Sequence, residues 1–378
     1  MKIGVVGKGK MGSDIFYYLD DFDFDLRWVC RKREDVVKLN GAYEKKQARL
    51  KRNGVISDEE FLKKTTDTTI SENLEILGDC DIIIEAVSEN ISVKRELFNK
   101  IYKISKKNAV ILTNSSSIKP SSILSENIDA GTFLGAHFFY PVKLKNIVEI
   151  IYTEKTDKII IDRVIDFMEK INRKYLLLDE KNAFILNQIL LPAQAEAFNL
   201  SVEYSIPYSV IDAVVKSAFF PLGIFQFFDS VGNIVIVQSI KNYIFDEKDP
   251  VILRFYSQIL NKMHEMILES EKISKSALFY DYLGIKDDKH SDKLIENYGD
   301  FLYKRIIYLF INSFFRYSEQ SGVSPEKLDG AIKEYCGTDE SAIDLSDAIG
   351  RKNIREYLNE IFYENKNKLF CPSKYLFN

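Results

Sequence analysis

Two ionisable side chains in the first half of the chain have the types and spacing of a proton-transfer pair. His137 lies inside the apolar run FLGAHFFYPV, and Glu149 follows in NIVEIIY. If these runs form neighbouring strands, the carboxylate can orient the imidazole, which then serves as a general base. A lone histidine on an apolar run can equally be a satisfied core residue, and spacing alone leaves both interpretations open.

A glycine-rich turn near the N-terminus indicates a nucleotide site. Gly7, Gly9 and Gly12 follow the β-branched run at 2–6 in the spacing GxGxxG. This order predicts a buried strand, a tight turn and a helix whose N-terminus faces phosphates. The first glycine permits the turn, the second admits a pyrophosphate, and the third lets the helix pack on the strand. We therefore expect a dinucleotide cofactor.

The next predicted strand, at 25–30, bears on the choice of cofactor. Dinucleotide folds usually place a carboxylate at its end to hold the adenosine ribose, but this chain has Cys30 followed by Arg31 and two further basic residues. An arginine fork matches a 2′-phosphate, which favours NADP. Glu34 or Asp35 can instead serve the ribose of NAD, so both cofactors remain open.

The elements that must position these residues alternate along the chain. Strand-like runs at 81–86 and 109–113 enclose a helical stretch at 91–105, and 35–64 has the pattern of two helices. Such alternation predicts an α/β fold with a Rossmann-type, doubly wound parallel sheet. Ser115, Ser116 and Ser117 follow the second run, where a hydroxyl can face a ligand or cap a turn.

Composition excludes several classes of function. The 378 residues carry a net charge of -4, which offers no basic field for a nucleic acid. Apolar runs stay below the roughly 18 residues that a membrane helix needs. The four cysteines form no CxxC pair, and three scattered histidines give little support for a metal site. We expect a cytoplasmic protein without a membrane or nucleic-acid partner.

Several ordered segments resemble the 3-hydroxyacyl-CoA dehydrogenase family. GKGKMGSDI is similar to the family's GxGxMGxGI turn, IIEAVSENISVKRELF to VEAVxENxxVKxELF, and TNSSSI to NTSSL. GAHFFYPV and FFPLGIFQFFDSVG likewise resemble GxHFFNPV and FPxGPFELxDxVG. The resemblance covers residues 1–240 closely, and the spacing of His137 and Glu149 is that of the family's catalytic pair.

The resemblance implies an NAD- or NADP-dependent oxidoreductase of fatty acid metabolism. It would interconvert a 3-hydroxyacyl thioester and the 3-oxoacyl thioester, carried on coenzyme A or an acyl carrier protein. His137 would take the hydroxyl proton while Glu149 orients the ring. Ser116 would bind the reacting oxygen, and Asn187 would contact the substrate.

The resemblance also assigns binding residues and shows departures. The cofactor positions are Gly7, Gly9, Met11, Gly12, Arg31, Glu89, Lys94 and Asn114, and the substrate positions are Lys45, Lys46, Arg49 and Tyr140. The basic helix at 45–52 would meet the adenine end of coenzyme A. Tyr140 replaces the family's asparagine, 182–184 replaces a Pro-Gly-Phe turn, and Gln188 replaces an arginine. These changes leave two alternatives: a dehydrogenase of a free 3-hydroxy acid, or a non-catalytic dinucleotide-binding protein.

The second half of the chain has the pattern of a duplication. The segment IPYSVIDAVVK…FFDSVG recurs as VSPEKLDGAIK…DLSDAIG about 117 residues later. We predict a dinucleotide-binding domain at 1–180 followed by two repeated all-α domains, at 181–290 and 295–378. The position corresponding to Asn187 in the second copy is Lys304. Two copies in one chain would form an internal pseudo-dimer in a monomer, with a homodimer as the alternative.

Overall fold

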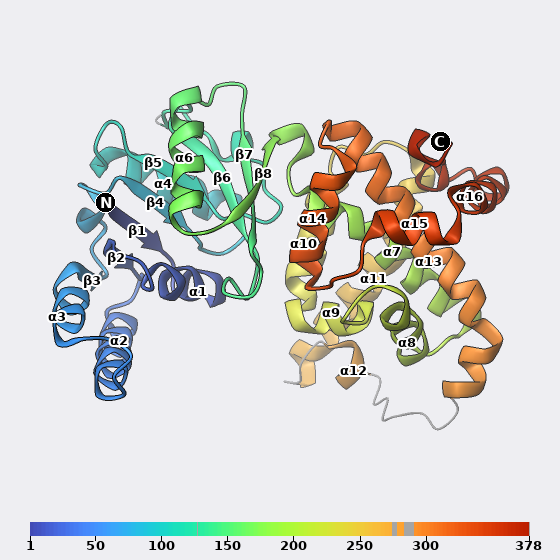
Figure 1. Cartoon of the computed structure of the whole chain (residues 1–378), viewed down its shortest axis with the longest axis horizontal. Coiled ribbons are helices and arrows are strands. Elements are labelled where there is room, and N and C mark those ends of the chain that lie inside the picture. The colour runs from blue at the N-terminus through green and yellow to red at the C-terminus, as the bar shows by residue number, and fades with distance from the viewer. Residues whose placement is uncertain (127, 274–277, 283–290, 378) are drawn as a thin grey trace. The chain divides into compact units, whose positions relative to one another are not determined.

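The computed structural model describes residues 1–126, 128–273, 278–282 and 291–377. The chain divides into two compact units, Met1–Ala183 and Phe184–Asn378 (Figure 1). The first unit ends three residues beyond the boundary predicted from the sequence. The boundary expected at 290 lies outside the described residues.

The first unit is built on one eight-stranded sheet with the strand order β3-β2-β1-β4-β5-β6-β7-β8. The strands are β1 (Lys2–Val6), β2 (Asp25–Val29), β3 (Thr68–Ser71), β4 (Ile82–Glu85), β5 (Val110–Thr113), β6 (Phe133–Phe138), β7 (Ile147–Tyr152) and β8 (Lys174–Asp179). Strands β1 to β6 are parallel, as predicted. Strand β7 runs antiparallel to β6, and β8 runs parallel to β7, so the sheet is mixed at this edge.

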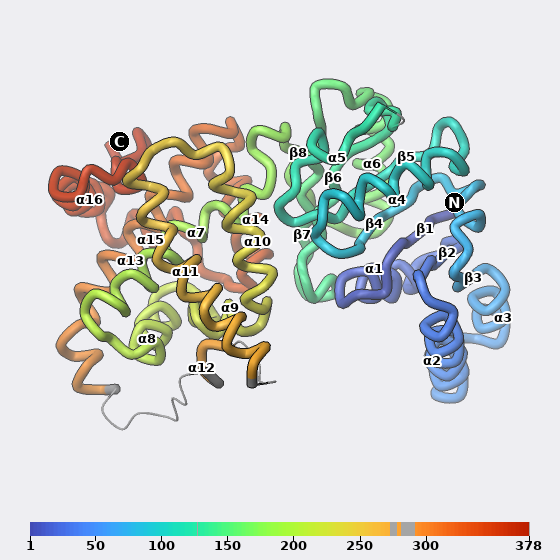
Figure 2. The backbone as a smooth tube through the Cα atoms, turned by 180° about the vertical axis from the view of Figure 1, so that it is seen from behind, coloured from blue at the N-terminus to red at the C-terminus, as the bar shows by residue number. Residues whose placement is uncertain are grey.

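Helices cover both faces of this sheet. The helices of the first unit are α1 (Lys10–Leu19), α2 (Arg33–Arg52), α3 (Asp58–Asp67), α4 (Ile91–Ile104), α5 (Pro120–Ile123) and α6 (Lys158–Lys170). Helices α1 and α6 lie in front of the sheet in Figure 1, and α4 and α5 lie in front of it in the reverse view of Figure 2. Each face has its own apolar core, because the fully buried parallel strands present side chains to both sides.

The single tryptophan links the first turn to the core. Trp28 of β2 is fully buried and stacks on Phe16 of α1, with ring centroids 4.2 Å apart. Its indole nitrogen donates a hydrogen bond of 2.7 Å to the carbonyl oxygen of Gly7. The conformation of the glycine turn is therefore supported from beneath by a buried side chain.

Helices α2 and α3 form a hairpin that projects from the sheet (Figure 1). Ser57 and Glu60 form the capping box that the sequence predicted for α3. Asp20, at the end of α1, holds the hairpin: its carboxylate accepts hydrogen bonds from Tyr43, Lys46 and Gln47. This carboxylate is 3% exposed, so it acts as a buried polar anchor between α1 and α2.

The second unit is helical over its described residues. Its helices are α7 (Ile185–Tyr204), α8 (Tyr208–Ala218), α9 (Ile224–Val231), α10 (Asn233–Tyr243), α11 (Pro250–Ile273), α12 (Phe279–Tyr282), α13 (Ser291–Ser321), α14 (Pro325–Cys336), α15 (Ala342–Ile349) and α16 (Arg351–Asn365). The long helices α7 and α13 pack against each other, α8 also packs against α13, and α14 packs against α7.

Equivalent hydrogen bonds occur in the two halves of this unit. Asp212 accepts a hydrogen bond of 3.0 Å from the backbone N–H of Phe225, and Asp329 accepts one of 2.7 Å from the N–H of Ala342. The hydroxyls of Ser201 and Ser318 each donate a 2.6 Å bond to a carbonyl five residues later. The glycines that end α9 and α15 both have a positive φ, of 96° and 88°.

Candidate active site

The glycine turn lies where β1 and β4 meet, at the point where the strand order reverses. Gly7 has a φ of 119°, and a Cβ there would come within 2.3 Å of the Ala86 carbonyl oxygen. A Cβ on Gly12 would come equally close to the Gly7 carbonyl oxygen. A Cβ on Gly9 would meet no atom within 4 Å. Gly7 and Gly12 are thus required by packing, whereas Gly9 leaves open space at the N-terminus of α1.

This arrangement fits a dinucleotide phosphate. Gly9 is the N-cap of α1 and has no side chain to bond the first amides of the helix. The positive end of the helix dipole would favour an anion at the open face of Gly9. Met11 is partly buried against the sheet core, so its side chain supports the turn from the protein side.

The end of β2 carries no ionised group at Cys30. Burial raises the pKa of the Cys30 thiol to about 11, and the nearby Asp35 adds to this effect. Asp35 itself pairs with Lys8 of the glycine turn, with Oδ1 and Nζ 2.7 Å apart. Arg31 is exposed directly beyond the strand. The segment after β2 thus presents an exposed arginine, and the carboxylate of Asp35 is bound to a lysine.

His137 and Glu149 are paired directly across β6 and β7. The antiparallel register places the two residues opposite each other, and His137 Nδ1 lies 2.7 Å from Glu149 Oε2. His137 is 5% exposed and Glu149 is fully buried. A carboxylate bonded to Nδ1 sets the tautomer in which Nδ1 carries the proton and Nε2 has a lone pair. The two side chains are therefore in hydrogen-bond contact across neighbouring strands, and their acid–base role stays a prediction.

The serine turn after β5 is held by Glu89. The Glu89 carboxylate accepts hydrogen bonds from the Ser115 hydroxyl, the Ser116 amide and the Ser117 amide and hydroxyl, at 2.5–3.0 Å. Burial works to raise the pKa of Glu89, but the charge of Lys94 and these hydrogen bonds hold it below its usual value. Glu89 therefore fixes the backbone that presents Ser116.

Sequence analysis did not identify a second carboxylate next to this network. Glu85 is the last residue of β4 and is fully buried. Its oxygens lie 2.7 Å and 3.0 Å from Lys94 Nζ, and it also accepts a bond from Thr113. A charged residue ending an otherwise apolar strand was the available signal. Lys94 was predicted to contact the cofactor, but it is only 1% exposed and its amino group is bound by Glu85 within the protein.

Asn114 follows β5, and Tyr140 lies two residues beyond the end of β6, the strand that carries His137. Asn114 Oδ1 accepts a 2.9 Å hydrogen bond from the amide of Phe138, so it ties the end of β5 to β6. The Phe139 ring packs against the His137 ring at a centroid distance of 4.3 Å. The Tyr140 ring is 46% exposed, and Lys10 Nζ of the glycine turn lies 4.0 Å from its centroid. Tyr140 therefore contacts the turn, in addition to following the histidine strand.

Asn187 lies in the first turn of α7, in the second unit. Its Nδ2 donates a 3.0 Å hydrogen bond to the Tyr243 hydroxyl, and its Oδ1 accepts a 2.8 Å bond from the Tyr335 hydroxyl. The neighbouring Gln188 accepts a bond of 3.2 Å from Tyr317. The two tyrosines that bind Asn187 were not identified from the sequence, because they lie far from it along the chain.

The departure at 182–184 has a local structural explanation. Ala183 has a φ of -58°, which any residue can adopt, so the glycine of the family's turn is not needed there. Phe184 has a φ of 60°, in the left-handed region. Its side chain is 2% exposed, so burial of the ring offsets the unfavourable backbone conformation.

The basic residues predicted to bind coenzyme A have two different environments. Lys45 and Arg49 are exposed on the same side of α2, four residues apart. Lys46 is half-buried, and its Nζ lies 2.7 Å from Asp20 Oδ2. Lys46 thus anchors the hairpin. The charge pattern of the sequence did not distinguish this structural role from the predicted binding of coenzyme A.

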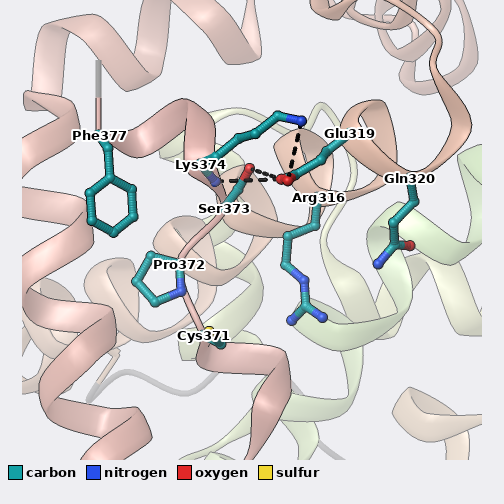
Figure 3. A pocket seen from close by; sticks show the side chains of 8 residues that line it. All are labelled: Arg316, Glu319, Gln320, Cys371, Pro372, Ser373, Lys374 and Phe377. Carbon is teal, nitrogen blue, oxygen red and sulfur yellow. Dashed lines mark hydrogen bonds and ion pairs between the residues drawn. The ribbon is translucent and has the colours of Figure 1, made fainter.

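Other kinds of site receive no support from the described parts of the chain. Over those residues there is no group of three potential metal ligands and no helix long and apolar enough to cross a membrane. A cavity of about 590 Å³ lies in the second unit beside the C-terminal segment. Glu319 of α13 binds Ser373 and Lys374 across it (Figure 3). It contains none of the residues predicted for the active site.

Comparison with known proteins identifies the family of the chain. Residues 2–181 match the model of the 3-hydroxyacyl-CoA dehydrogenase NAD binding domain, and residues 184–282 match that of the C-terminal domain. The 3-hydroxybutyryl-CoA dehydrogenase of Clostridioides difficile is 30% identical over 255 residues, covering 65% of this chain and 88% of that protein. The enzyme of that name from Bradyrhizobium diazoefficiens is 30% identical over 236 residues, covering 61% and 79%.

Solved structures show a similar fold over a greater length. The 3-hydroxybutyryl-CoA dehydrogenase of Escherichia coli K12 superposes with a TM-score of 0.79 at 16% identity, covering 100% of this chain and 97% of that one. The dehydrogenase part of multifunctional enzyme 1 from C. elegans gives a TM-score of 0.59 at 20% identity, covering 99% and 88%. With the family matches over both units, the chain belongs to the 3-hydroxyacyl-CoA dehydrogenase family of oxidoreductases, with an NAD(P)-binding first unit.

Proposed function

We propose that this chain catalyses the NAD(P)-dependent interconversion of a 3-hydroxyacyl-CoA and the corresponding 3-oxoacyl-CoA, in fatty acid metabolism. The observation that carries the proposal is the buried pair of His137 and Glu149, 2.7 Å apart, in the same sheet that carries the glycine turn. A buried carboxylate–imidazole pair suits proton transfer from a hydroxyl group. The names of the curated relatives point to the same reaction class.

His137 is proposed to act as the general base in the oxidation direction. The Nε2 lone pair accepts the proton of the 3-hydroxyl, while Nδ1–H donates to Glu149. When NAD(P)+ is bound, its nicotinamide supplies the acceptor for the hydride that leaves C3 of the substrate. The Glu149 carboxylate stabilises the imidazolium that forms, because both groups are shielded from water. In the reverse direction the imidazolium returns the proton to the oxygen.

The other proposed roles follow from the contacts of each residue. Ser116 binds the reacting oxygen from a turn that Glu89 holds in place, and Lys94 keeps Glu89 ionised. Asn114 aligns the strand that carries the base. Asn187 contacts the acyl thioester. Gly7, Gly9, Met11 and Gly12 form the dinucleotide turn.

Cofactor choice follows from the end of β2. We propose that the chain prefers NADP, because Arg31 is exposed beyond the strand while Cys30 is a neutral thiol. The carboxylate of Asp35 that would otherwise bind a ribose hydroxyl is engaged by Lys8. An arginine placed there can form a bidentate contact with a 2′-phosphate.

The carrier of the acyl group is proposed to be coenzyme A. Lys45 and Arg49 are exposed cations on one side of α2 and can meet its phosphates, whereas Lys46 is held by Asp20. Tyr140 is proposed to limit the acyl group, because it follows the histidine strand and its ring centroid lies 4.0 Å from Lys10 Nζ of the glycine turn. An acyl carrier protein and a free 3-hydroxy acid are the other substrates to be tested.

We also propose that the second unit is a duplicated domain forming an internal pseudo-dimer in a monomeric protein. The matching bonds of Asp212 and Asp329, and of Ser201 and Ser318, support a duplication. The packing of α7 on α13, α8 on α13 and α7 on α14 supports a pseudo-symmetric pair. A homodimer is the alternative for light scattering to test.

A cytoplasmic location is also proposed, because the four described cysteines are free thiols.

A substrate panel tests the function. Reduction of acetoacetyl-CoA, acetoacetyl carrier protein, free acetoacetate and the N-acetylcysteamine thioester is followed at 340 nm with NADPH and NADH. We expect turnover of the coenzyme A thioester. We expect Lys45→Ala/Arg49→Ala to raise its KM several-fold without changing the KM of the short thioester, which lacks the adenosine end. Lys107→Ala is the matched control, because that residue is also an exposed cation of the first unit.

Each alternative has its own outcome in this panel. Turnover only of the carrier-protein thioester would show that an acyl carrier protein, and not coenzyme A, carries the acyl group. Turnover only of free acetoacetate would show that the substrate is a free acid. Binding of NADPH or NADH without turnover of any compound would instead establish a non-catalytic dinucleotide-binding protein and overturn the proposal.

A further inference from the structure

The amide of Asn187 is held at both ends by tyrosine hydroxyls. Tyr335 donates to its Oδ1 at 2.8 Å, and its Nδ2 donates to Tyr243 at 3.0 Å. Tyr243 is the last residue of α10, and Tyr335 lies near the end of α14. The first bond joins residues 148 positions apart, so it connects the beginning of the helical unit to its second half.

Two bonds restrict the amide more than one does. Rotation about the terminal torsion of an asparagine bonded at one end breaks one hydrogen bond, whereas rotation here breaks two. Tyr335 is 8% exposed, so water competes poorly for its hydroxyl. One N–H and one lone pair of the amide are not used by these two bonds. Their direction is therefore set by the tyrosines.

The two halves of the helical unit differ at this point. In the alignment defined by Asp212 and Asp329, Tyr335 corresponds to Ala218 and Asn187 corresponds to Lys304. The second half therefore has neither an equivalent asparagine nor, facing it, an equivalent tyrosine from the first half. The tyrosine is present only where it can bind the asparagine.

We propose that Tyr335 is a positioning residue for substrate binding: the second half of the helical unit supplies the hydroxyl that orients Asn187. This inference rests on the proposed function, in which Asn187 contacts the acyl thioester. It assigns the second half a role in the reaction, beyond its packing against the first half. It also means that Asn187 is oriented by residues of its own chain.

A double-mutant cycle tests the proposal. Kinetics with acetoacetyl-CoA are measured for Tyr335→Phe, Asn187→Ala and the double variant. We expect Tyr335→Phe to raise KM about tenfold with little change in kcat, because loss of one shielded hydrogen bond weakens substrate orientation. In the Asn187→Ala background the same substitution should have less than a twofold effect, since the amide it orients is absent.

The matched control is Tyr308→Phe. Tyr308 is a similarly buried tyrosine of the second half, 6% exposed, that packs on Tyr303 and Tyr357. We expect its KM to remain within twofold of wild type. A purely structural defect would lower the active fraction, and therefore kcat, and would persist in the Asn187→Ala background. Thermal unfolding of each variant reports folding independently.

The results separate the inference from the proposed function. No turnover by the wild type overturns the proposed function and this inference with it. Turnover that Asn187→Ala weakens but Tyr335→Phe does not, or an equal effect of Tyr335→Phe in both backgrounds, overturns the inference alone. If Tyr335→Phe does not fold, Tyr243→Phe releases the other end of the amide. Its effect must then depend on Asn187 in the same way, or the two-ended restraint is refuted.

Discussion

Replacing Glu149 by glutamine removes one buried charge and keeps the shape of the side chain. Glu149 is fully buried, and its Oε2 lies 2.7 Å from His137 Nδ1. When His137 accepts the substrate proton, the carboxylate and the imidazolium have charge centres about 4 Å apart, which is worth about 4 kcal/mol at an effective dielectric constant of about 20. At about 1.4 kcal/mol for each tenfold in rate, Glu149→Gln should lower kcat about a thousandfold.

A second effect acts in the same direction. The amide of glutamine can donate a hydrogen bond to Nδ1, which places the proton on Nε2 and removes the lone pair that the substrate hydroxyl needs. Because the pair is shielded from water, added salt should restore little activity. The rate loss is expected in kcat, since Glu149 acts on the reaction through His137 in the proposed arrangement.

The assay is the initial rate of 3-hydroxybutyryl-CoA oxidation at saturating cofactor, followed as formation of the reduced cofactor at 340 nm, with binding measured separately. Trp28 is the single tryptophan and donates to the Gly7 carbonyl beneath the dinucleotide turn, so its fluorescence reports cofactor binding. The cofactor Kd of the variant should stay within about twofold of wild type. A variant that binds cofactor normally and retains more than a tenth of the wild-type kcat would refute the assigned role of Glu149.

Three further substitutions test other parts of the structure. Gly9→Ala should fold normally and weaken cofactor binding at least tenfold, because its Cβ enters the open space proposed for the phosphate. Gly12→Ala should instead lower the melting temperature, because its Cβ meets a carbonyl oxygen at 2.3 Å. Cofactor titration and thermal unfolding distinguish the two variants, and equal effects of both on binding and on melting temperature would contradict this prediction. Arg31→Ala should raise the Kd of NADPH about tenfold and leave that of NADH unchanged, as measured by Trp28 fluorescence; a parallel change for both would count against a 2′-phosphate contact. Burial works to raise the pKa of Asp20, but hydrogen bonds and the charges of Lys46 and Lys64 hold the pKa below its usual value. The stability that these ion pairs contribute is therefore present above about pH 4 and is lost as the pH falls further. Asp20→Asn should therefore lower the free energy of unfolding by about 3 kcal/mol near pH 7, and by less in acid, in urea titrations; an equal loss at both pH values would contradict the ion pairing.

Local patterns in the sequence predicted much of the first unit. The run KIGVV and the glycines after it specify a buried strand, a turn and a helix, because each residue type favours the same local structure. The capping box at Ser57 and Glu60 was readable for the same reason. Strands β3 and β8 and the antiparallel direction of β7 were not predicted, since pairing direction depends on contacts between distant segments.

The candidate site shows the same division. His137 and Glu149 could be proposed as a pair from their types and spacing, but their direct opposition depends on the antiparallel register of β6 and β7. The roles of Lys46 and Lys94 depend on Asp20 and Glu85, which pair with them over longer distances in the chain. A charge pattern identifies cations but does not show which of them are already neutralised.

Contacts between the halves of the helical unit were the least accessible to sequence reasoning. The proposed duplication rests on the recurring aspartate and glycine positions, and these residues make similar hydrogen bonds and turns in the structure. Tyr335 carries no local signal, because nothing around it in the sequence indicates that its hydroxyl binds Asn187. The hydrogen bond on which its proposed role rests is apparent only from the positions of the two side chains in space.

The most direct test of the central claim compares wild type with His137→Ala. Reduction of acetoacetyl-CoA is followed at 340 nm with NADPH and NADH in parallel, and cofactor binding is measured by Trp28 fluorescence. We predict turnover by the wild type and a loss of at least about a hundredfold in kcat for the variant, with cofactor binding retained. Equal turnover by the two proteins would contradict the assignment of His137 as the group that carries the proton.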